Sequence, residues 1–537
     1  MKRLVFSISL LAGVALSLQA PTSAQSAFTR RSLTAIAGAP LLQSDRDLTA
    51  LSRSGELQRV GLVADTLVPG REHERWQQTV NGVPVWATTI TRQTQSALPV
   101  SVFGEVYTGL ETLDTTPRLT PEDARARAAA DAGVSVGPLA TSLYVLVTDV
   151  GPRLVYTVRI ASPGLAITRY FVDARTGDIV EKRDDTQHEV GTGTGVFGPD
   201  KKISTTRFAG SFVTDDSLRP PTLQTFNMRG AAFAVLLLEQ GLRELSPSDL
   251  ASDADNHWTD AAVVDAHVYS GWVYDYLYKR FGRLGLDDHN LPIINIVHPA
   301  NRSDYSTIGA LVPDFFAQAS YVGGGVMIYG EGLPAGVTLG GWTWDYTSGA
   351  LDIVAHELTH GVTDYTSQLE YRGESGALNE AFSDIIGTSV EFFFQPEGAA
   401  RGQADWLIGE DVVRPGGLRS MANPAAYGGP DHYSHRFTGS TDNGGVHTNS
   451  NIVNQAYFLA VVGGRNATSG LSVTGVGLTN REQLEKVFYR AFTTMLPAQA
   501  RFTTARAATI QAARDLYGAG STVERAVTDA WTAVGVL

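Results

Sequence analysis

The first apolar stretch of the chain runs from Leu4 to Leu18 and follows two basic residues. A basic start, an apolar core and small residues behind it are typical of a secretory signal peptide, and the small-residue segment ending at Ala24 predicts that residues 1–24 are removed. A transmembrane anchor is the alternative, but the stretch is interrupted by serines and falls short of the roughly 20 apolar residues that span a bilayer. We therefore expect a secreted, extracellular protein with no membrane association after signal removal.

Short alternations of apolar and polar residues dominate the region that follows, up to the glycine-rich segment 191–195. Two alternating segments flank Asn81 and Gly82, which is the pattern of a β-hairpin with a tight turn. Thr120, followed by a proline and many alanines, predicts a helix to Ala132, and later apolar runs predict strands. This region is expected to be a small α+β domain that ends near the glycines.

Beyond the glycines the pattern changes twice. Up to about residue 350 the chain is rich in Gly, Thr, Asp and aromatic residues, which predicts short strands and long loops around one helix, 260–281. From 351 onward apolar positions recur with the helical period, as in 483–495 and 503–516. The fold class is therefore α+β, with a β-rich lobe followed by an α-helical lobe, and catalytic clefts often form where two such halves meet.

Composition narrows the range of functions. The 537 residues are 43% hydrophobic and 18% charged, enough apolar content for two or more packed domains. With 42 Lys and Arg against 55 Asp and Glu, the net charge of -13 disfavours nucleic acid and anionic membranes as partners. The chain has no cysteine and only 11 histidines, so a metal site must use His, Asp and Glu.

One histidine cluster carries chemistry: His356-Glu357-Leu358-Thr359-His360, inside the apolar-periodic segment 351–363. Two histidines four residues apart lie on one helix face, so both imidazoles can reach one tetrahedral zinc ion. Glu357 is then held beside the metal without ligating it, where it can take a proton from zinc-bound water. The bare pattern also arises by chance on solvated helices, so its surroundings must decide.

The surroundings favour a metal site, because a second amphipathic helix follows and carries Glu380 and Asp384. Glu380 supplies the third ligand, and Asp384, one turn later, can accept the free ring N–H of a ligating histidine and fix its tautomer. A solvated acidic face is the alternative. Leu378 and Phe382 predict burial instead, and a buried acid needs a partner such as a cation.

At this point the chain resembles the thermolysin-like secreted zinc metallopeptidases, over about 196–537 and most densely over 351–462. His356, His360 and Glu380 match that family's zinc ligands in type and spacing, and Glu357 matches its general base. The resemblance implies a zincin-type catalytic unit that binds one catalytic Zn²⁺.

The resemblance also implies roles for residues around the metal. Tyr371 and His447 match the residues that stabilise the oxyanion of the tetrahedral intermediate. Asp442 would hold the imidazole of His447 and keep it protonated, and Arg419 matches the arginine that binds the substrate carbonyl.

Members of this family are made as precursors with a signal peptide and an inhibitory propeptide, which the region before residue 190 resembles. The expected organisation is a signal peptide (1–24), an inhibitory propeptide (25–189, hairpin-rich over about 45–115 and α+β over about 118–184), a β-rich N-terminal lobe of the catalytic domain (190–350) and an α-helical C-terminal lobe (351–537).

A structural calcium site is expected on the same two helices and the loop after them. Four acids could form an oxygen-only Ca²⁺ shell: Asp352, Glu391, Asp405 and Glu410. The family's paired site has two further ligands where this chain has Gln403 and Leu407, so one ion is expected there in place of two. Asp253 and Asp255 resemble another family calcium loop, with an Asx-rich turn as the alternative.

Substrate contacts are expected on an edge strand and in an apolar pocket beside the zinc. Where the family usually has Asn-Ala-Phe-Trp, this chain has Gln318-Ala319-Ser320-Tyr321, and Gln318 offers the same amide one methylene further out. Three side chains would line a pocket that accepts a bulky hydrophobic residue after the cleaved bond, with shallow core packing as the alternative: Ile353, Ile408 and Leu418.

These features predict a secreted zinc endopeptidase that is synthesised as a self-inhibited, self-processing precursor. Its expected partners are protein and peptide substrates and its own propeptide, and it is expected to be a monomer. A zinc peptidase that trims only chain ends and a catalytically silent adhesion module are the alternatives. A cut at 189/190 leaves 23 basic and 36 acidic residues in the mature part and 19 of each before it, so the acidity belongs to the enzyme.

Overall fold

The computed structural model describes residues 28–134, 141–161, 167–185, 188–208 and 210–537. The expected signal peptide, 1–24, lies outside these ranges. The chain divides into two compact units, up to Asp185 and from Thr186 onward. None of the helices in the described ranges combines the length and apolar character that crossing a bilayer requires.

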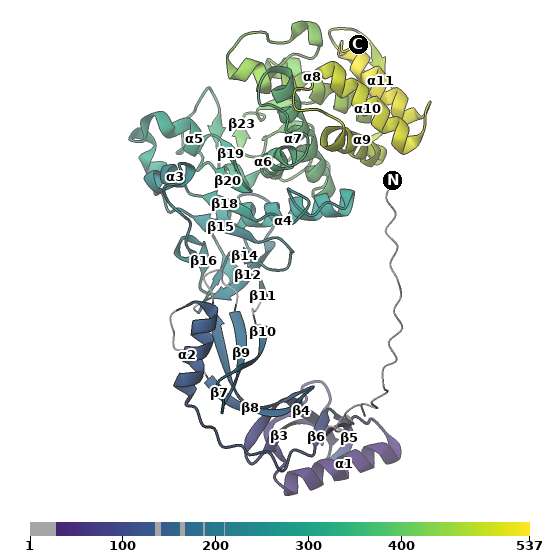
Figure 1. Ribbon diagram of the computed structural model, residues 1–537. Coiled ribbons are helices and arrows are strands. Elements are labelled where there is room, and N and C mark those ends of the chain that lie inside the picture. Colours follow the sequence, from purple (N-terminus) through teal and green to yellow (C-terminus); the bar gives the residue numbers. More distant parts are fainter. Residues whose placement is uncertain (1–27, 135–140, 162–166, 186–187, 209) are drawn as a thin grey trace, which may run out of the picture. The chain divides into compact units, whose positions relative to one another are not determined.

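The first unit is built on one eight-stranded sheet (Figure 1). Seven of its strands follow the order β10-β9-β8-β7-β4-β3-β2, and the eighth, β5, pairs with β4. Strands β1 and β6 form a separate pair. The elements of this unit are β1 (Thr29–Ser32), α1 (Gly38–Arg53), β2 (Leu57–Ala64), β3 (Arg71–Val80), β4 (Val83–Gln95), β5 (Leu98–Phe103), β6 (Glu105–Thr108), α2 (Pro121–Ala132), β7 (Thr141–Thr148), β8 (Gly151–Ala161), β9 (Ile167–Asp173) and β10 (Ile179–Asp184).

The predicted hairpin and helix of this unit are confirmed. β3 and β4 pair antiparallel around Asn81 and Gly82, whose φ angles of 49° and 82° suit a tight hairpin turn. Thr120 caps α2 in a capping box with Asp123, and α2 ends at Ala132, as its sequence indicates. α1 and α2 each cover a separate apolar core on the unit's strands.

The second unit begins with two five-stranded sheets, ordered β16-β13-β12-β11-β17 and β14-β15-β18-β20-β19. In the second of these, β19 pairs with β20 alone and forms an edge of the sheet. The strands are β11 (His188–Gly193), β12 (Lys201–Phe208), β13 (Ser211–Val213), β14 (Asp215–Asp216), β15 (Leu223–Asn227), β16 (Ser252–Asp253), β17 (His257–Trp258), β18 (Ile293–Val297), β19 (Ala319–Gly323), β20 (Val326–Tyr329), and the short pairs β21 (Thr343–Trp344), β22 (Leu407–Ile408), β23 (Val413–Arg414), β24 (Arg419–Ser420), β25 (Gly464–Arg465) and β26 (Ser472–Val473).

Helices dominate the rest of this unit, as the periodicity predicts (Figure 1). One large apolar core joins α4 to the C-terminal helices. The helices are α3 (Ala232–Glu239), α4 (Ala261–Phe281), α5 (Val312–Phe316), α6 (Leu351–Asp364), α7 (Gly373–Phe394), α8 (Asp442–Val462), α9 (Arg481–Thr494), α10 (Phe502–Tyr517) and α11 (Thr522–Ala533).

The crossing of α6 and α7 positions the predicted metal ligands. At the crossing, a Cβ added to Gly387 would lie 2.6 Å from the carbonyl oxygen of Asp352, so only glycine allows the backbones to approach this closely. The histidines of α6 and Glu380 of α7 are thereby brought face to face.

Candidate active site

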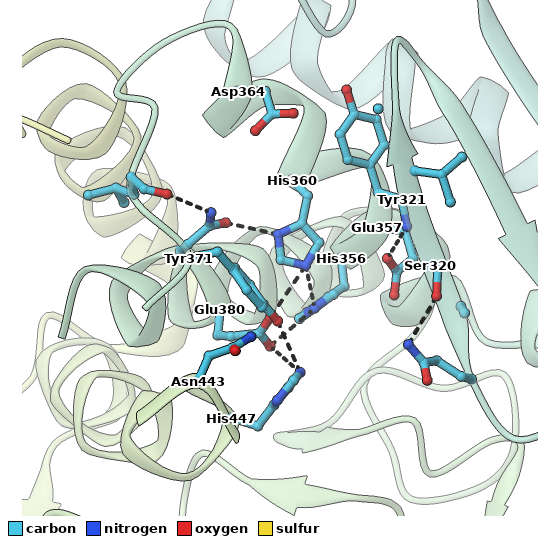
Figure 2. A pocket seen from close by; sticks show the side chains of 16 residues that line it. Ser320, Tyr321, His356, Glu357, His360, Asp364, Tyr371, Glu380, Asn443 and His447 are labelled. Atoms are coloured by element: carbon cyan, nitrogen blue, oxygen red, sulfur yellow. Dashed lines mark hydrogen bonds and ion pairs between the residues drawn. The ribbon is translucent and has the colours of Figure 1, made fainter. Parts of the chain in front are cut away.

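The three predicted zinc ligands meet where α6 crosses α7. The Nε2 atoms of His356 and His360 lie 3.1 Å apart, and each is 3.5 Å from a carboxylate oxygen of Glu380. Figure 2 shows the two imidazoles and the carboxylate pointing at one another. Two imidazole nitrogens and one carboxylate are the donor set of a catalytic zinc site with an open position.

Each histidine is oriented by a partner on α7. Asp384 lies 2.9 Å from Nδ1 of His356, and the amide oxygen of Asn379 lies 2.8 Å from Nδ1 of His360. These contacts leave both Nε2 atoms facing Glu380, because an Nδ1–H donated to an oxygen fixes the tautomer.

Electrostatics also fit a cation. Glu380 is fully buried, and its Oε2 accepts no hydrogen bond from the residues that the structure describes. Burial alone would raise its pKa, but His356, His360 and other nearby cations lower it to about 2. Burial lowers the pKa of His356, and Asp384 outweighs burial and raises it to about 9. A carboxylate that stays ionised beside the two imidazoles suits a zinc ion, which would displace the proton that His356 otherwise holds.

Glu357 lies beside the ligands on α6 and points away from them, toward the edge strand β19. Its Oε2 accepts a hydrogen bond of 2.8 Å from the backbone N–H of Tyr321 (Figure 2). Its side chain remains in contact with the cleft, which both it and His356 line. A carboxylate held in this way can accept a proton from a water molecule in the cleft.

The predicted oxyanion donors lie on the opposite wall. The hydroxyl of Tyr371 lies 3.2 Å from Nε2 of His447 and also donates to Glu380. Asp442 lies 2.6 Å from Nδ1 of His447 and accepts a 3.0 Å hydrogen bond from its backbone N–H.

The turn that carries His447 is unusual in its backbone. Asp442 and Asn443 have φ angles of 53° and 46°, in the left-handed region that non-glycine residues seldom adopt. Two glycines follow with positive φ. Backbone strain of this kind persists where the surrounding structure enforces it, and here it aims an imidazole at the cleft.

The structure places Arg419 next to the ligands. Its Nε and Nη2 donate to the two oxygens of Asp384, both at 2.8 Å, which leaves its remaining N–H groups for other acceptors. Asn454 donates to the same carboxylate at 2.7 Å. Burial lowers and Asp384 more than restores the pKa of the guanidinium, which is raised above its usual value.

The predicted apolar pocket also exists. A hollow of about 210 Å³ is lined by Ile353, Ile408 and Leu418 together with His356, Glu357 and Arg419. It adjoins a larger cleft of about 730 Å³ that contains the ligands. Gln318 and Ala319 line both, and the side-chain amide of Gln318 donates to Ser320 at 3.0 Å.

The predicted calcium acids come together only in part. Glu391 and Glu410 lie with Asp411 in a buried group whose oxygens are within 4.8 Å of one another. Burial and the neighbouring acids raise the pKa of Glu410 to about 10, and the pKa of Glu391 is raised well above its usual value. Both oxygens of each glutamate lack a hydrogen-bond partner among the described residues.

The other two predicted calcium ligands lie beside this group. Asp352 is buried and accepts hydrogen bonds from the backbone N–H groups of Ile353 and Gly409, at 2.7 and 2.6 Å. Its charge, and that of Asp405, raises the pKa of Glu391 and of Glu410. Asp253 lies elsewhere, and one of its carboxylate oxygens accepts hydrogen bonds from the backbone N–H groups of Asp255 and Asn256. These hydrogen bonds form an Asx turn, as the alternative interpretation of this segment expects.

Sequence reasoning missed four contributors, one of which is Asn454, whose side-chain amide donates to Asp384. Asn379 directly precedes Glu380, and Asp411 directly follows Glu410, so adjacency was the available signal. The backbone N–H of Tyr321 left no signal, because any residue supplies it.

Comparisons with known proteins agree with this geometry. Residues 190–364 match a family model described as the thermolysin metallopeptidase catalytic domain, and residues 367–536 match the alpha-helical domain of the same family. Residues 118–183 match the peptidase propeptide and YPEB domain.

Similar proteins were found along most of the chain. A thermostable neutral protease from Geobacillus stearothermophilus is 37% identical over 518 residues, covering 89% of this chain and 86% of that protein. A thermolysin from Alicyclobacillus acidocaldarius is 37% identical over 514 residues, covering 89% and 86%. A solved precursor of protealysin, a metalloproteinase from Serratia proteamaculans, is 27% identical with a TM-score of 0.43 and covers 59% of this chain and 87% of that chain.

Proposed function

Because this chain belongs to the thermolysin metallopeptidase family and is a zinc metalloendopeptidase, we propose that it hydrolyses internal peptide bonds with Glu357 as the general base. We further propose that it prefers bonds that precede a bulky hydrophobic residue, and that it is secreted as a self-inhibited precursor which processes itself.

The observation that carries the proposal is the meeting of two sets of groups in one cleft. His356, His360 and Glu380 form a metal-ligand set, and Glu357 and His447 flank it from opposite walls. A surface adhesion module has no use for a general base and a proton donor that both face a metal site.

Zinc held by these three ligands would supply Lewis acidity, which polarises a peptide carbonyl and makes water more acidic. Glu357 is positioned to accept a proton from the attacking water and to pass it to the leaving amine. Tyr371 and His447 are positioned to donate to the oxygen on which negative charge develops. Asp442 orients His447, and Arg419 offers its remaining N–H groups to a substrate carbonyl.

The preference for a bulky hydrophobic residue rests on the hollow of about 210 Å³ beside Glu357. Ile353, Ile408 and Leu418 give it apolar walls, and burying a leucine or phenylalanine side chain there favours binding by about 1.5–3 kcal/mol. The edge strand β19, with Gln318 and Ala319, is open to pair with the substrate backbone.

A calcium ion is proposed for the buried acids. An all-oxygen donor set suits Ca²⁺, and buried carboxylates without partners are costly unless a cation neutralises them. Glu391, Glu410 and Asp411 would hold the ion, with Asp352 and Asp405 close by. A single ion is proposed at this site, with a structural role.

The precursor is proposed to be divided as the sequence indicates, with maturation near 189/190 and a monomeric product. The peptidase propeptide match over 118–183 supports an intramolecular partner for the catalytic unit. Secretion is proposed from the basic and apolar start of the chain.

The test is digestion of casein by the purified secreted protein, followed by mass spectrometry of the products. Internal fragments with Leu, Ile or Phe at their new N-termini, lost with a zinc chelator and restored with Zn²⁺, are expected. Products shortened only from the ends would establish the end-trimming alternative, and random new N-termini would refute the preference.

A further inference from the structure

A second hollow, of about 830 Å³, continues the active-site cleft on one side. It shares Tyr371 and Asn443 with the cleft, and Figure 2 shows these two residues together on the wall that faces Ser320 and Tyr321. Its lining comprises Glu370, Tyr371, Arg372, Gly373, Thr438, Gly439, Ser440, Asn443 and Gly444.

The side of the cleaved bond on which the second hollow lies follows from a comparison of its lining with that of the apolar pocket. None of its lining residues belongs to the apolar pocket of Ile353, Ile408 and Leu418. If that pocket takes the residue after the cleaved bond, the second hollow lies toward the residues before the bond. An extended peptide that passes Tyr371 therefore continues into it.

The charged residues that line the second hollow differ in whether they are free to contact a substrate. Of the described residues that line it, only Arg372 is positively charged, and its exposed guanidinium has no hydrogen bond or ion pair within the described part of the chain. Glu370 is the one acid, and its Oε2 accepts a 3.1 Å hydrogen bond from Gln499. The nearby Glu374 is bound to the hydroxyl of Tyr433 and the N–H of Phe502.

We propose that Arg372 is a specificity-determining residue that favours an acidic side chain in the substrate, two or three residues before the cleaved bond. This inference rests on the proposed endopeptidase function and refines its substrate class. The hydroxyls of Thr438 and Ser440 supply further donors for a carboxylate. The glycines in the lining leave room for the side chain, since a Cβ on Gly373 would meet nothing within 4 Å.

An exposed ion pair of this kind changes rates modestly, so the expected selectivity is about two- to fivefold. It should weaken as salt is added, because exposed charges are screened. The rest of the enzyme opposes it, since the mature part of the chain is strongly acidic. A preference for substrate acids must therefore come from a local cation such as Arg372.

The experiment compares quenched fluorescent peptides that share one Ala–Leu cleavage bond and carry Glu or Gln at the second or third position before it. The ratio of kcat/KM for the Glu peptide to that for the Gln peptide is measured in wild type, Arg372→Gln, Arg372→Lys and Arg490→Gln. Arg490 is a matched control, because it is an exposed arginine on α9 that pairs with Asp515 and lines neither hollow.

The wild type and Arg490→Gln should favour the Glu peptide by about two- to fivefold at one of the two positions, and Arg372→Lys should keep most of that preference. Arg372→Gln should bring the ratio to about one. An equal rate on both peptides in the wild type, or an unchanged ratio in Arg372→Gln, would overturn the inference alone. Failure of the wild type to cleave either peptide would overturn the proposed function and this inference with it.

Discussion

Replacing Asp384 by asparagine tests how the site holds its metal. The Asp384 carboxylate is completely buried and accepts from His356 at 2.9 Å, from two nitrogens of Arg419 at 2.8 Å and from Asn454 at 2.7 Å. Burial would raise its pKa, but Arg419 and His356 drive that pKa far below its usual value, so the group is ionised. Asparagine keeps the size of the side chain and removes the charge.

The substitution should weaken zinc binding and lower the stability of the fold, and the magnitude of each effect can be given. Loss of a charged partner to a metal-ligating histidine typically weakens metal binding 10- to 100-fold, or about 1.4–2.7 kcal/mol. Removing one member of a buried ion pair costs about 3–5 kcal/mol of stability. Arg419 keeps a neutral acceptor in the asparagine variant, so the lower end of that range is expected.

Zinc affinity is measured by competition with a chromophoric chelator, and stability by urea denaturation, both in the Glu357→Gln background to prevent self-digestion. Asp265→Asn is the matched control, because Asp265 is equally buried and forms an ion pair of 2.9 Å with Lys201. Neither of these two residues contacts the zinc ligands His356, His360 and Glu380. The control should lose stability but keep its zinc affinity. A folded Asp384→Asn protein whose zinc Kd changes less than threefold would show that the charge of Asp384 does not support zinc binding.

Three further predictions concern the wall of oxyanion donors, the partly buried His298 and the acidic group. Tyr371→Phe should lower kcat for a quenched peptide by about 100-fold with zinc content unchanged, and a change below fivefold would exclude a role as an oxyanion donor. His298 lies between Asp260 and Glu331, which outweigh burial and raise its pKa from 6.5 to about 10. Because the pKa of His298 is raised in the folded state, its ion pairs stabilise the fold fully below about pH 6.5, and this stabilisation is lost as the pH rises through 10. His298→Gln should therefore lower Tm more at pH 6 than at pH 10. An equal loss of Tm at both pH values would contradict this. Calcium at 100 times its Kd should stabilise the Glu357→Gln protein by about 2.7 kcal/mol in thermal melts, and Glu391→Gln should abolish the response; no response to Ca²⁺ in the parent would refute the site.

Elements set by local chemistry could be predicted from the sequence. The Asn81-Gly82 turn, the Thr120 cap of α2 and the helix that carries His356 and His360 each depend on residues a few positions apart. The spacing of the two histidines fixes their common face, because a helix has 3.6 residues per turn.

Features that depend on the crossing of distant elements could not be predicted in the same way. The close approach of α6 and α7 at Gly387, and the N–H of Tyr321 that holds Glu357, join segments far apart in the sequence. The inclusion of Asp411 in the acidic group depends on how the loop after α7 folds back. The hollow beside Arg372 is formed by two loops that no local pattern relates.

Glu357→Gln tests most directly whether Glu357 is the general base of a zinc endopeptidase. Glutamine keeps an oxygen that can accept from Tyr321 but cannot take up the proton of water. Metal analysis and casein digestion are performed on the same sample of secreted protein. The expected product is an unprocessed precursor that contains one zinc ion per chain and cleaves no casein. Normal maturation and casein cleavage by this variant would show that Glu357 is not the general base.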